Sequence, residues 1–149
     1  MNDKLAKPAL RVVAAIIWKQ GKILLARKAK GTSNQGLWEF PGGKLEANES
    51  ELACAKREIL EELGLEVEPI SVIGCTSLSL SRGGQLTLIG VFCRAKESPR
   101  SLTDHDAWEW VTPAHIARYH LAEADKPLVT KTLTFLEGAD LGHFGELQD

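Results

Sequence analysis

Hydrophobic and polar residues follow one another in a pattern that predicts strands first and a helix next. From Leu10 the run LRVVAAIIW is almost continuously apolar, KQGK supplies a glycine turn, and ILLARKA resumes the apolar run. This pattern predicts a hairpin of two largely buried strands. A polar, glycine-bounded loop follows at 30–36, LWEF is a candidate short strand, and PGG is a backbone bend.

A helix is predicted from Glu49 to Leu63, directly after this bend. Asn48 is a suitable N-cap, and Glu51 three residues later completes a capping-box pattern. Gly64 stands where a C-cap glycine belongs. The helix therefore has a start signal and a stop signal in the sequence.

The two faces of this helix differ in chemistry. At about 100° per residue, one stripe is apolar and consists of Leu52, Ala55, Ile59 and Leu63. Another arc carries Glu58, Glu61 and Glu62. Like charges four residues apart weaken a helix, and anions near its C-terminal end oppose the helix dipole. A solvated surface explains these acids poorly, so we expect a bound cation.

The second half of the chain adds strands at 65–80, 85–95 and 107–112, the first two separated by the turn SRGG. Thr112 is predicted to cap a short helix, and a final helix is predicted to start near Pro127 and stop at Gly138. Strands and helices do not alternate regularly, which favours an α/β (α+β) fold with a mixed sheet sandwiched between helices.

Length and composition agree with one domain. The chain has 149 residues, of which 44% are hydrophobic and 26% charged, enough for a real core. We expect a single domain over 1–149 with its core at about 10–138, and a loose tail after Asp140. No repeat or linker interrupts it.

Charge and cysteine content limit the classes of partner. A net charge of -2 gives no general attraction to a nucleic acid polymer. The three cysteines form no C-x-x-C pair and are odd in number, which argues against a disulfide framework and favours a cytoplasmic location. The sequence shows no targeting peptide and no apolar run long enough to span a bilayer, so no membrane association is expected.

The acidic arc predicts a magnesium site. Mg²⁺ prefers oxygen ligands and commonly bridges carboxylates to substrate phosphates. Arg57, beside these acids, is suited to orient them through a fork of hydrogen bonds, and Glu49 is its expected partner.

These residues also carry a family resemblance. Gly43, Glu49, Arg57, Glu58, Ile59, Glu61, Glu62, Gly64 and Leu65 match the Nudix box G-x5-E-x7-R-E-U-x-E-E-x-G-U without a departure. The segments LWEFPGGKLE and LAEADKPLV resemble the MutT-type branch of that family, so the likeness extends from 10 to 136. It implies the Nudix fold, a mixed sheet between helices.

The resemblance implies that Glu58, Glu61 and Glu62 ligate Mg²⁺, or Mn²⁺ in its place, together with the Gly42 carbonyl. Glu49 and Arg57 would support them. It also implies hydrolysis of a nucleoside triphosphate to the monophosphate and pyrophosphate, by attack of water on the β-phosphorus.

Relatives of this type often place a further acid before the late tryptophan-containing strand. In the segment LTDHDAWEW we select Asp104, with Asp106 and His105 as rivals. His105 is equally well explained as a polar loop residue.

The resemblance also implies substrate contacts outside the box. Arg27 and Lys28 at the end of the second strand are candidate phosphate contacts, and plain surface charges are the alternative. Glu39 is a candidate substrate contact. Among the aromatic residues, most of which we expect in the core, Phe40 is selected to stack on a base.

Asp125 occupies the position where the best-known MutT pattern has an asparagine that reads the base. An ionised aspartate only accepts hydrogen bonds and would favour the exocyclic amine of cytosine. An aspartate kept protonated by burial would donate to O6 of an oxidised guanine. The alternative is that Asp125 caps the last helix.

The leading reading is a Mg²⁺-dependent nucleoside triphosphate pyrophosphohydrolase that removes oxidised nucleotides such as 8-oxo-dGTP. One alternative keeps the chemistry and takes CTP, dCTP or 5-substituted pyrimidine triphosphates. Another is a catalytically silent nucleotide-binding Nudix module, against which the intact box argues. The protein is expected to be a monomer or homodimer.

Overall fold

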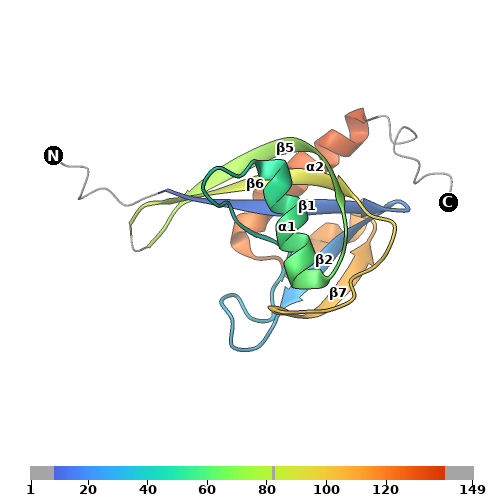
Figure 1. Cartoon of the computed structure of the whole chain (residues 1–149), viewed down its shortest axis with the longest axis horizontal. Coiled ribbons are helices and arrows are strands. Elements are labelled where there is room, and N and C mark those ends of the chain that lie inside the picture. The colour runs from blue at the N-terminus through green and yellow to red at the C-terminus, as the bar shows by residue number, and fades with distance from the viewer. Residues whose placement is uncertain (1–8, 82, 140–149) are drawn as a thin grey trace.

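A computed structural model describes residues 9–81 and 83–139 of the chain, so the expectation of a loose tail after Asp140 lies outside the described residues. Its centre is a seven-stranded sheet with the order β3-β2-β1-β6-β5, with β4 paired to β1 and β7 paired to β2 (Figure 1). The strands are β1 (Leu10–Lys19), β2 (Lys22–Lys28), β3 (Trp38–Glu39), β4 (Gly42–Lys44), β5 (Glu68–Ser79), β6 (Gln85–Arg94) and β7 (His105–Val111).

The sheet is mixed, as predicted. Strands β1 and β6 run parallel, with Leu10 opposite Leu86 and Trp18 opposite Arg94. The other strand pairs are antiparallel. The predicted hairpin of β1 and β2 is confirmed, since these strands pair antiparallel around the turn at Gln20 and Gly21. The sequence pattern did not predict the parallel pairing of β1 with β6.

Helices α1 (Glu51–Leu63) and α2 (Lys126–Gly138) pack on opposite faces of the sheet. Alternate residues of β1 enter two separate cores, which explains why this strand is apolar on both faces. Val13, Ala15 and Ile17 pack with Cys54, Ala55, Ile59 and Leu63 of α1. Ala14, Ile16 and Trp18 pack with Leu128 and Val129 of α2. In Figure 1, α1 lies in front of the sheet.

Helix α1 begins two residues later than predicted. Its N-cap is Ser50, whose Oγ accepts a hydrogen bond from the Ala53 amide at 3.0 Å. The predicted Asn48 cap and capping box are therefore wrong, and Asn48 instead adopts a turn conformation with φ of 63°. Glu49 consequently stands outside the helix. The C-cap was predicted correctly, since Gly64 is left-handed with φ of 58° and donates to the Leu60 carbonyl.

The segment before α2 contains two short 3-10 helices, Pro113–Arg118 and Glu123–Asp125. Thr112 precedes the first, but its hydroxyl bonds to the His115 ring at 2.9 Å and not to a backbone amide. Helix α2 has a proline in its first turn, as predicted. No helix among the described residues has the length and apolar character needed to cross a bilayer.

Candidate active site

Arg57 is the centre of an ion-pair network at the start and middle of α1. Its Nε donates to Glu49 Oε2 at 2.6 Å and its Nη2 donates to Glu49 Oε1 at 3.0 Å. The same guanidinium donates from Nη1 to Glu58 at 3.0 Å and to Glu61 at 3.2 Å. The predicted pairing of Arg57 with Glu49 is confirmed, and its two-pronged geometry is the strong form of such a contact.

The pKa values of Glu49 and Glu58 are shifted in opposite directions. The hydrogen bonds from Arg57 lower the pKa of Glu49 to about 2. Burial raises the pKa of Glu58, although the Arg57 hydrogen bond acts in the opposite direction. Glu58 is 14% exposed and Glu61 is 60% exposed, so the two acids differ in their access to water. Glu49 is thus a fixed anion, whereas Glu58 is an acid whose charge is costly without a further cation.

Gly43 makes room for the Glu58 carboxylate. A Cβ on Gly43 would lie 2.1 Å from the Glu58 carboxyl carbon, which is closer than atoms approach without moving. Strand β4 is held here by its pairing with β1, in which Gly43 stands opposite Val13. The glycine of the box is therefore required by the acid that lies against it.

Glu62, in the last turn of α1, is subject to the charges of several groups outside the helix. The pKa of Glu62 is raised to about 7, mainly by burial; the charge of His105 lowers it, whereas the charges of Glu58, Asp104 and Glu39 contribute to the rise. Asp104, selected as the additional acid, is therefore within electrostatic reach of Glu62. Its backbone carbonyl also accepts a hydrogen bond from the Ala29 amide at 3.0 Å.

The two rivals of Asp104 have other partners. Asp106 is exposed and accepts a hydrogen bond from Arg27 Nε at 2.7 Å. His105 is the first residue of β7 and is buried, with Nε2 2.8 Å from Glu39 Oε2. The reading of His105 as a polar loop residue is wrong, since it belongs to the sheet. Sequence reasoning missed this pair because its members are 66 residues apart.

The candidate phosphate contacts lie at the end of β2. Arg27 is paired with Asp106 and lies 5.7 Å from the centre of the Trp38 ring. Lys28 is half-buried, and its ammonium has no ion-pair partner among the described residues. Of the two, Lys28 has the cation that is not already engaged.

Asp125 does not cap α2. Its side chain makes no capping hydrogen bond, and Oδ2 instead accepts from the Phe40 amide at 2.8 Å, across 85 residues of sequence. The residue is 5% exposed. Burial raises its pKa to about 7, against the Phe40 hydrogen bond, which lowers it. Asp125 is therefore a buried carboxyl group whose proton is exchangeable near neutral pH.

The prediction that the Phe40 ring stacks on a base is wrong. The residue is 3% exposed and its ring packs in the core beneath α2. What Phe40 provides instead is the backbone N–H that holds Asp125. Trp38, two residues before Phe40, is only partly buried. Its ring lies edge-on to that of Tyr119, with ring centres 5.1 Å apart.

The acids of α1 have the chemistry of a hard-cation site. Carboxylate oxygens are the ligands that Mg²⁺ prefers, and Glu58 and Glu62 carry raised pKa values that a nearby cation would lower. No group of three or more His, Cys, Asp or Glu side chains within 9–81 and 83–139 is arranged closely enough to hold a metal ion. The Arg57 guanidinium lies between Glu58 and Glu61. The oxygen atoms of these acids are of the kind that Mg²⁺ binds. The side chains of Glu58 and Glu61 must rotate away from Arg57 before they can bind one ion together.

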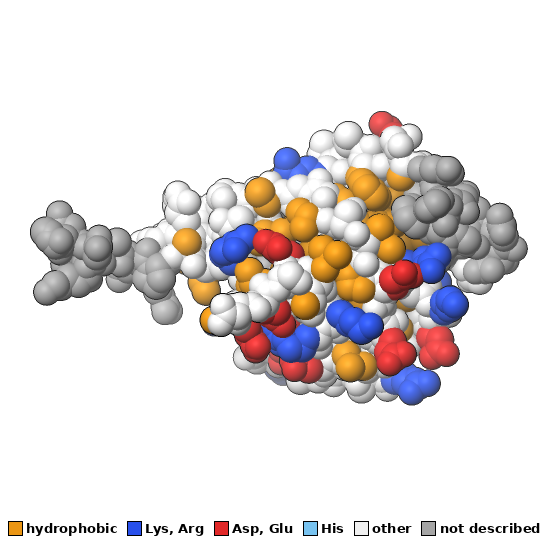
Figure 2. Space-filling view, turned by 45° about the horizontal axis from the view of Figure 1, so that its top comes forward, with side chains coloured by type: hydrophobic (Ala, Val, Ile, Leu, Met, Phe, Trp, Pro, Cys, Tyr) orange, Lys and Arg blue, Asp and Glu red, His pale blue; other side chains and the backbone are white. Residues whose placement is uncertain are grey.

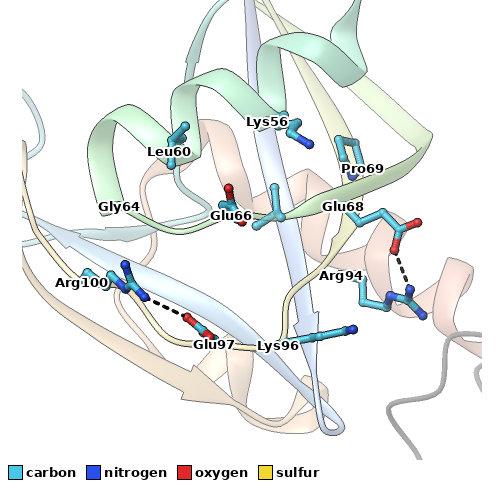
Figure 3. A pocket seen from close by; sticks show the side chains of 11 residues that line it. Lys56, Leu60, Gly64, Glu66, Glu68, Pro69, Arg94, Lys96, Glu97 and Arg100 are labelled. Atoms are coloured by element: carbon cyan, nitrogen blue, oxygen red, sulfur yellow. Dashed lines mark hydrogen bonds and ion pairs between the residues drawn. The ribbon is translucent and has the colours of Figure 1, made fainter.

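A separate groove of about 540 Å³ runs along another side of α1 (Figure 3). From the helix it is lined by Lys56, Leu60 and Gly64, which lie about 150° around the axis from the mean direction of the acidic arc. No predicted site residue lines it. Acidic and basic side chains are interspersed on the face seen in Figure 2, and no area of one sign dominates that face.

Neither of the two buried cysteines has the properties of a nucleophile, although the sulfur of Cys54 accepts a contact from Arg57 Nη2 at 3.8 Å. Cys54, Cys75 and Cys93 are all free. Burial raises the pKa values of Cys54 and Cys93 to about 12, so neither is a thiolate near neutral pH. Both pack in the core on the α1 side of the sheet.

Known proteins resemble the chain over most of its length. The family model of the NUDIX domain matches residues 7–132. A CTP pyrophosphohydrolase of Escherichia coli (strain K12) is 37% identical over 120 residues, which cover 80% of this chain and 88% of that protein. "Putative 8-oxo-dGTP diphosphatase 2" of Mycobacterium tuberculosis (strain ATCC 25618 / H37Rv) is 32% identical over 128 residues, 86% of this chain and 91% of that protein.

Solved structures agree. The solution structure of the E. coli ORF135 protein has a TM-score of 0.77 and 32% identity, covering 92% of this chain and 96% of that one. The crystal structure of the MutT protein from Methanosarcina mazei Go1 has a TM-score of 0.74 and 25% identity, covering 84% and 93%. With the complete box, the mixed sheet and these matches in agreement, the chain belongs to the Nudix family.

Proposed function

We propose that the protein is a divalent-metal-dependent nucleoside triphosphate pyrophosphohydrolase, which releases a nucleoside monophosphate and pyrophosphate. The observation that carries this proposal is the Arg57 network, in which one guanidinium holds Glu49, Glu58 and Glu61 within an unbroken Nudix box. The two curated relatives are named as a pyrophosphohydrolase and a diphosphatase, which supports hydrolysis of a phosphoric anhydride bond.

In this proposal Glu58, Glu61, Glu62 and the Gly42 carbonyl hold Mg²⁺, for which Mn²⁺ can substitute. When bound, the ion neutralises the triphosphate and lowers the pKa of a coordinated water. Glu49 and Arg57 keep the acids in place, since Glu49 stays ionised and fixes the guanidinium. Asp104 adds negative charge beside Glu62. Lys28 and Arg27 contact the phosphates, and Arg27 exchanges Asp106 for that contact.

Two base classes are supported by the state of Asp125. Because its pKa lies at about 7, the protonated form is populated at neutral pH and donates to O6 of an oxidised guanine. This supports 8-oxo-dGTP, in agreement with the name of the mycobacterial relative. The hydrogen bond from Phe40 favours the ionised form, which accepts from the amine of cytosine. That supports CTP or dCTP, in agreement with the E. coli relative.

The test is a nucleotide panel with pyrophosphate as the readout. We would measure pyrophosphate release from 8-oxo-dGTP, dGTP, 5-methyl-dCTP and CTP, with and without Mg²⁺, in H₂¹⁸O. Hydrolysis as proposed needs the metal and places ¹⁸O in pyrophosphate, because water attacks the β-phosphorus. Nucleotide binding without metal-dependent hydrolysis would identify a silent binding module instead.

Asp125→Asn tests the base assignment in the same panel. An asparagine both donates and accepts at every pH, so we expect the ratio of rates on 8-oxo-dGTP and CTP to change while hydrolysis persists. An unchanged ratio would remove Asp125 from base recognition. Within this proposal the chain is one Nudix domain over 1–149, cytoplasmic as its free cysteines suggest, and a monomer or homodimer.

A further inference from the structure

His105 is a buried histidine with one polar contact. Its side chain is 1% exposed, and its Nε2 lies 2.8 Å from Oε2 of Glu39, whose own side chain is 20% exposed. A carboxylate only accepts hydrogen bonds, so Nε2 carries the proton and donates. The other ring nitrogen, Nδ1, is buried and has no hydrogen-bond partner. The ring is therefore held by strand packing and by Glu39 alone.

The backbone fixes both partners on opposite sides of β2. In the sheet Glu39 stands opposite Ala26, and His105 stands opposite Lys28. The pairing of β7 with β2 shifts register between Arg27 and Lys28, which is the signature of a bulge. Bulges redirect side chains at sheet edges. Here His105 is buried against Glu39 while its neighbour Asp106 is exposed.

Glu39 directly precedes Phe40, whose amide donates to Asp125 at 2.8 Å, so the Glu39 backbone adjoins the end of the site where Asp125 lies. The charge of Glu39 also acts on Glu62, which places it within electrostatic reach of the acids of α1. One of its oxygens is engaged by His105, whereas Oε1 accepts no hydrogen bond from the described residues. A partly exposed carboxylate with one engaged and one open oxygen is oriented to meet a donor from a ligand.

We propose that His105 is a positioning residue, which holds the Glu39 carboxylate so that its open oxygen accepts a hydrogen bond from a sugar hydroxyl of the bound nucleotide. The sugar is the part of a nucleotide that connects a base at Asp125 with phosphates at the α1 acids. This inference rests on the proposed function, because it assumes that a nucleotide spans these two ends.

Two amide substitutions at His105 distinguish the effect of losing the Nε2 hydrogen-bond donor from the effect of replacing the ring. The amide nitrogen of glutamine reaches the place of Nε2, whereas that of asparagine reaches only the place of Nδ1. His105→Gln should therefore keep kcat/KM close to that of the parent. His105→Asn and Glu39→Gln should each lower it by about 10- to 100-fold, the range for loss of a hydrogen bond to a charged group. Thermal melting of each variant reports whether it is folded.

A double-mutant cycle tests whether His105 acts through Glu39. Adding His105→Asn to Glu39→Gln should cause no further loss of kcat/KM, since the group it positions is already gone. A 2′,3′-dideoxynucleoside triphosphate should show no penalty for either single variant, since it lacks the hydroxyls. The proposal would be overturned if His105→Asn lowered kcat/KM equally in the parent and in Glu39→Gln, or if a folded His105→Asn were fully active. It would also be overturned if either single variant had a lower kcat/KM than the parent on the dideoxy substrate.

A spectroscopic readout keeps this test independent of turnover. ¹⁵N NMR of the His105 ring should show the Nε2–H tautomer in the parent and a changed ring signal in Glu39→Gln. An unchanged signal refutes the contact. Failure of the proposed function is seen differently, as absence of pyrophosphate release by the parent on every nucleotide.

Discussion

Asp125→Asn should change how the stability of the protein depends on pH. The substitution keeps the shape of the side chain, and the amide oxygen can still accept from the Phe40 amide. What it removes is a titratable proton from a site that is 5% exposed. Because the residue is so well buried, solvent screening reduces its contribution little.

The sign follows from proton binding. The folded pKa of Asp125 is about 7, above the ordinary value of 3.8, so the native state holds a proton that the unfolded state has lost between these values. That contribution to stability is complete below about pH 4 and is lost as the pH rises through 7. The difference between the two pKa values corresponds to at most about 4 kcal/mol. Exchanging a charged for a neutral hydrogen-bond acceptor changes stability by about 1 kcal/mol, so the pH-dependent part is larger.

The assay is urea unfolding followed by circular dichroism at several pH values from 5 to 8. Parent and variant are compared at each pH, which cancels the similar effect of Glu62, present in both. We expect the free energy of unfolding of the variant, minus that of the parent, to increase as the pH rises. The m-values of the two proteins should be equal. Glu123→Gln, at an exposed residue, controls for loss of surface charge. A difference that stays constant from pH 5 to 8 would refute the reasoning.

Three other substitutions test the acid network. Glu58→Gln should lower kcat by about 100-fold or more without altering the melting temperature greatly, since a charge at the reaction centre is lost and volume is kept; pyrophosphate release and melting curves measure this. Gly43→Ala should lower kcat in a folded protein, because the new Cβ would meet the Glu58 carboxyl carbon at 2.1 Å and displace it; full activity would contradict the close contact. Arg57→Lys should lower kcat/KM by about tenfold or more while charge is retained, because an ammonium lacks the fork that engages Glu49 at two atoms; the same assay checks it, and an unchanged value would show that charge alone suffices.

The sequence predicted those features whose causes are local. Both-face burial of β1, the C-cap at Gly64 and the proline-initiated α2 follow from neighbouring residues and were confirmed. The Arg57–Glu49 pair was also predictable, since eight residues separate two groups of opposite charge. The N-cap was not, because Asn48 and Ser50 are both good caps and only the structure shows that Ser50 is used.

The remaining features depend on long-range pairing. Asp125 looks like a cap from its place before Pro127, yet its partner is the backbone of Phe40 in the bend between β3 and β4. The contact of His105 with Glu39 likewise exists only because β3 and β7 both pair with β2. The prediction that Phe40 stacks on a base was wrong because a side chain beside a glycine bend can point into the core as easily as out of it, and Phe40 points into the core.

The consecutive residues Glu39 and Phe40 make the two contacts that connect this segment to His105 and to Asp125. One is tied to His105 and the other to Asp125, so a single peptide unit, about 3.8 Å between Cα atoms, sets the spacing of these two anchors. Lengthening the loop at 30–36 leaves that spacing intact, whereas inserting one residue between Glu39 and Phe40 would pull the anchors apart. The relative placement of His105 and Asp125 therefore depends on this peptide unit and not on the length of the loop before it.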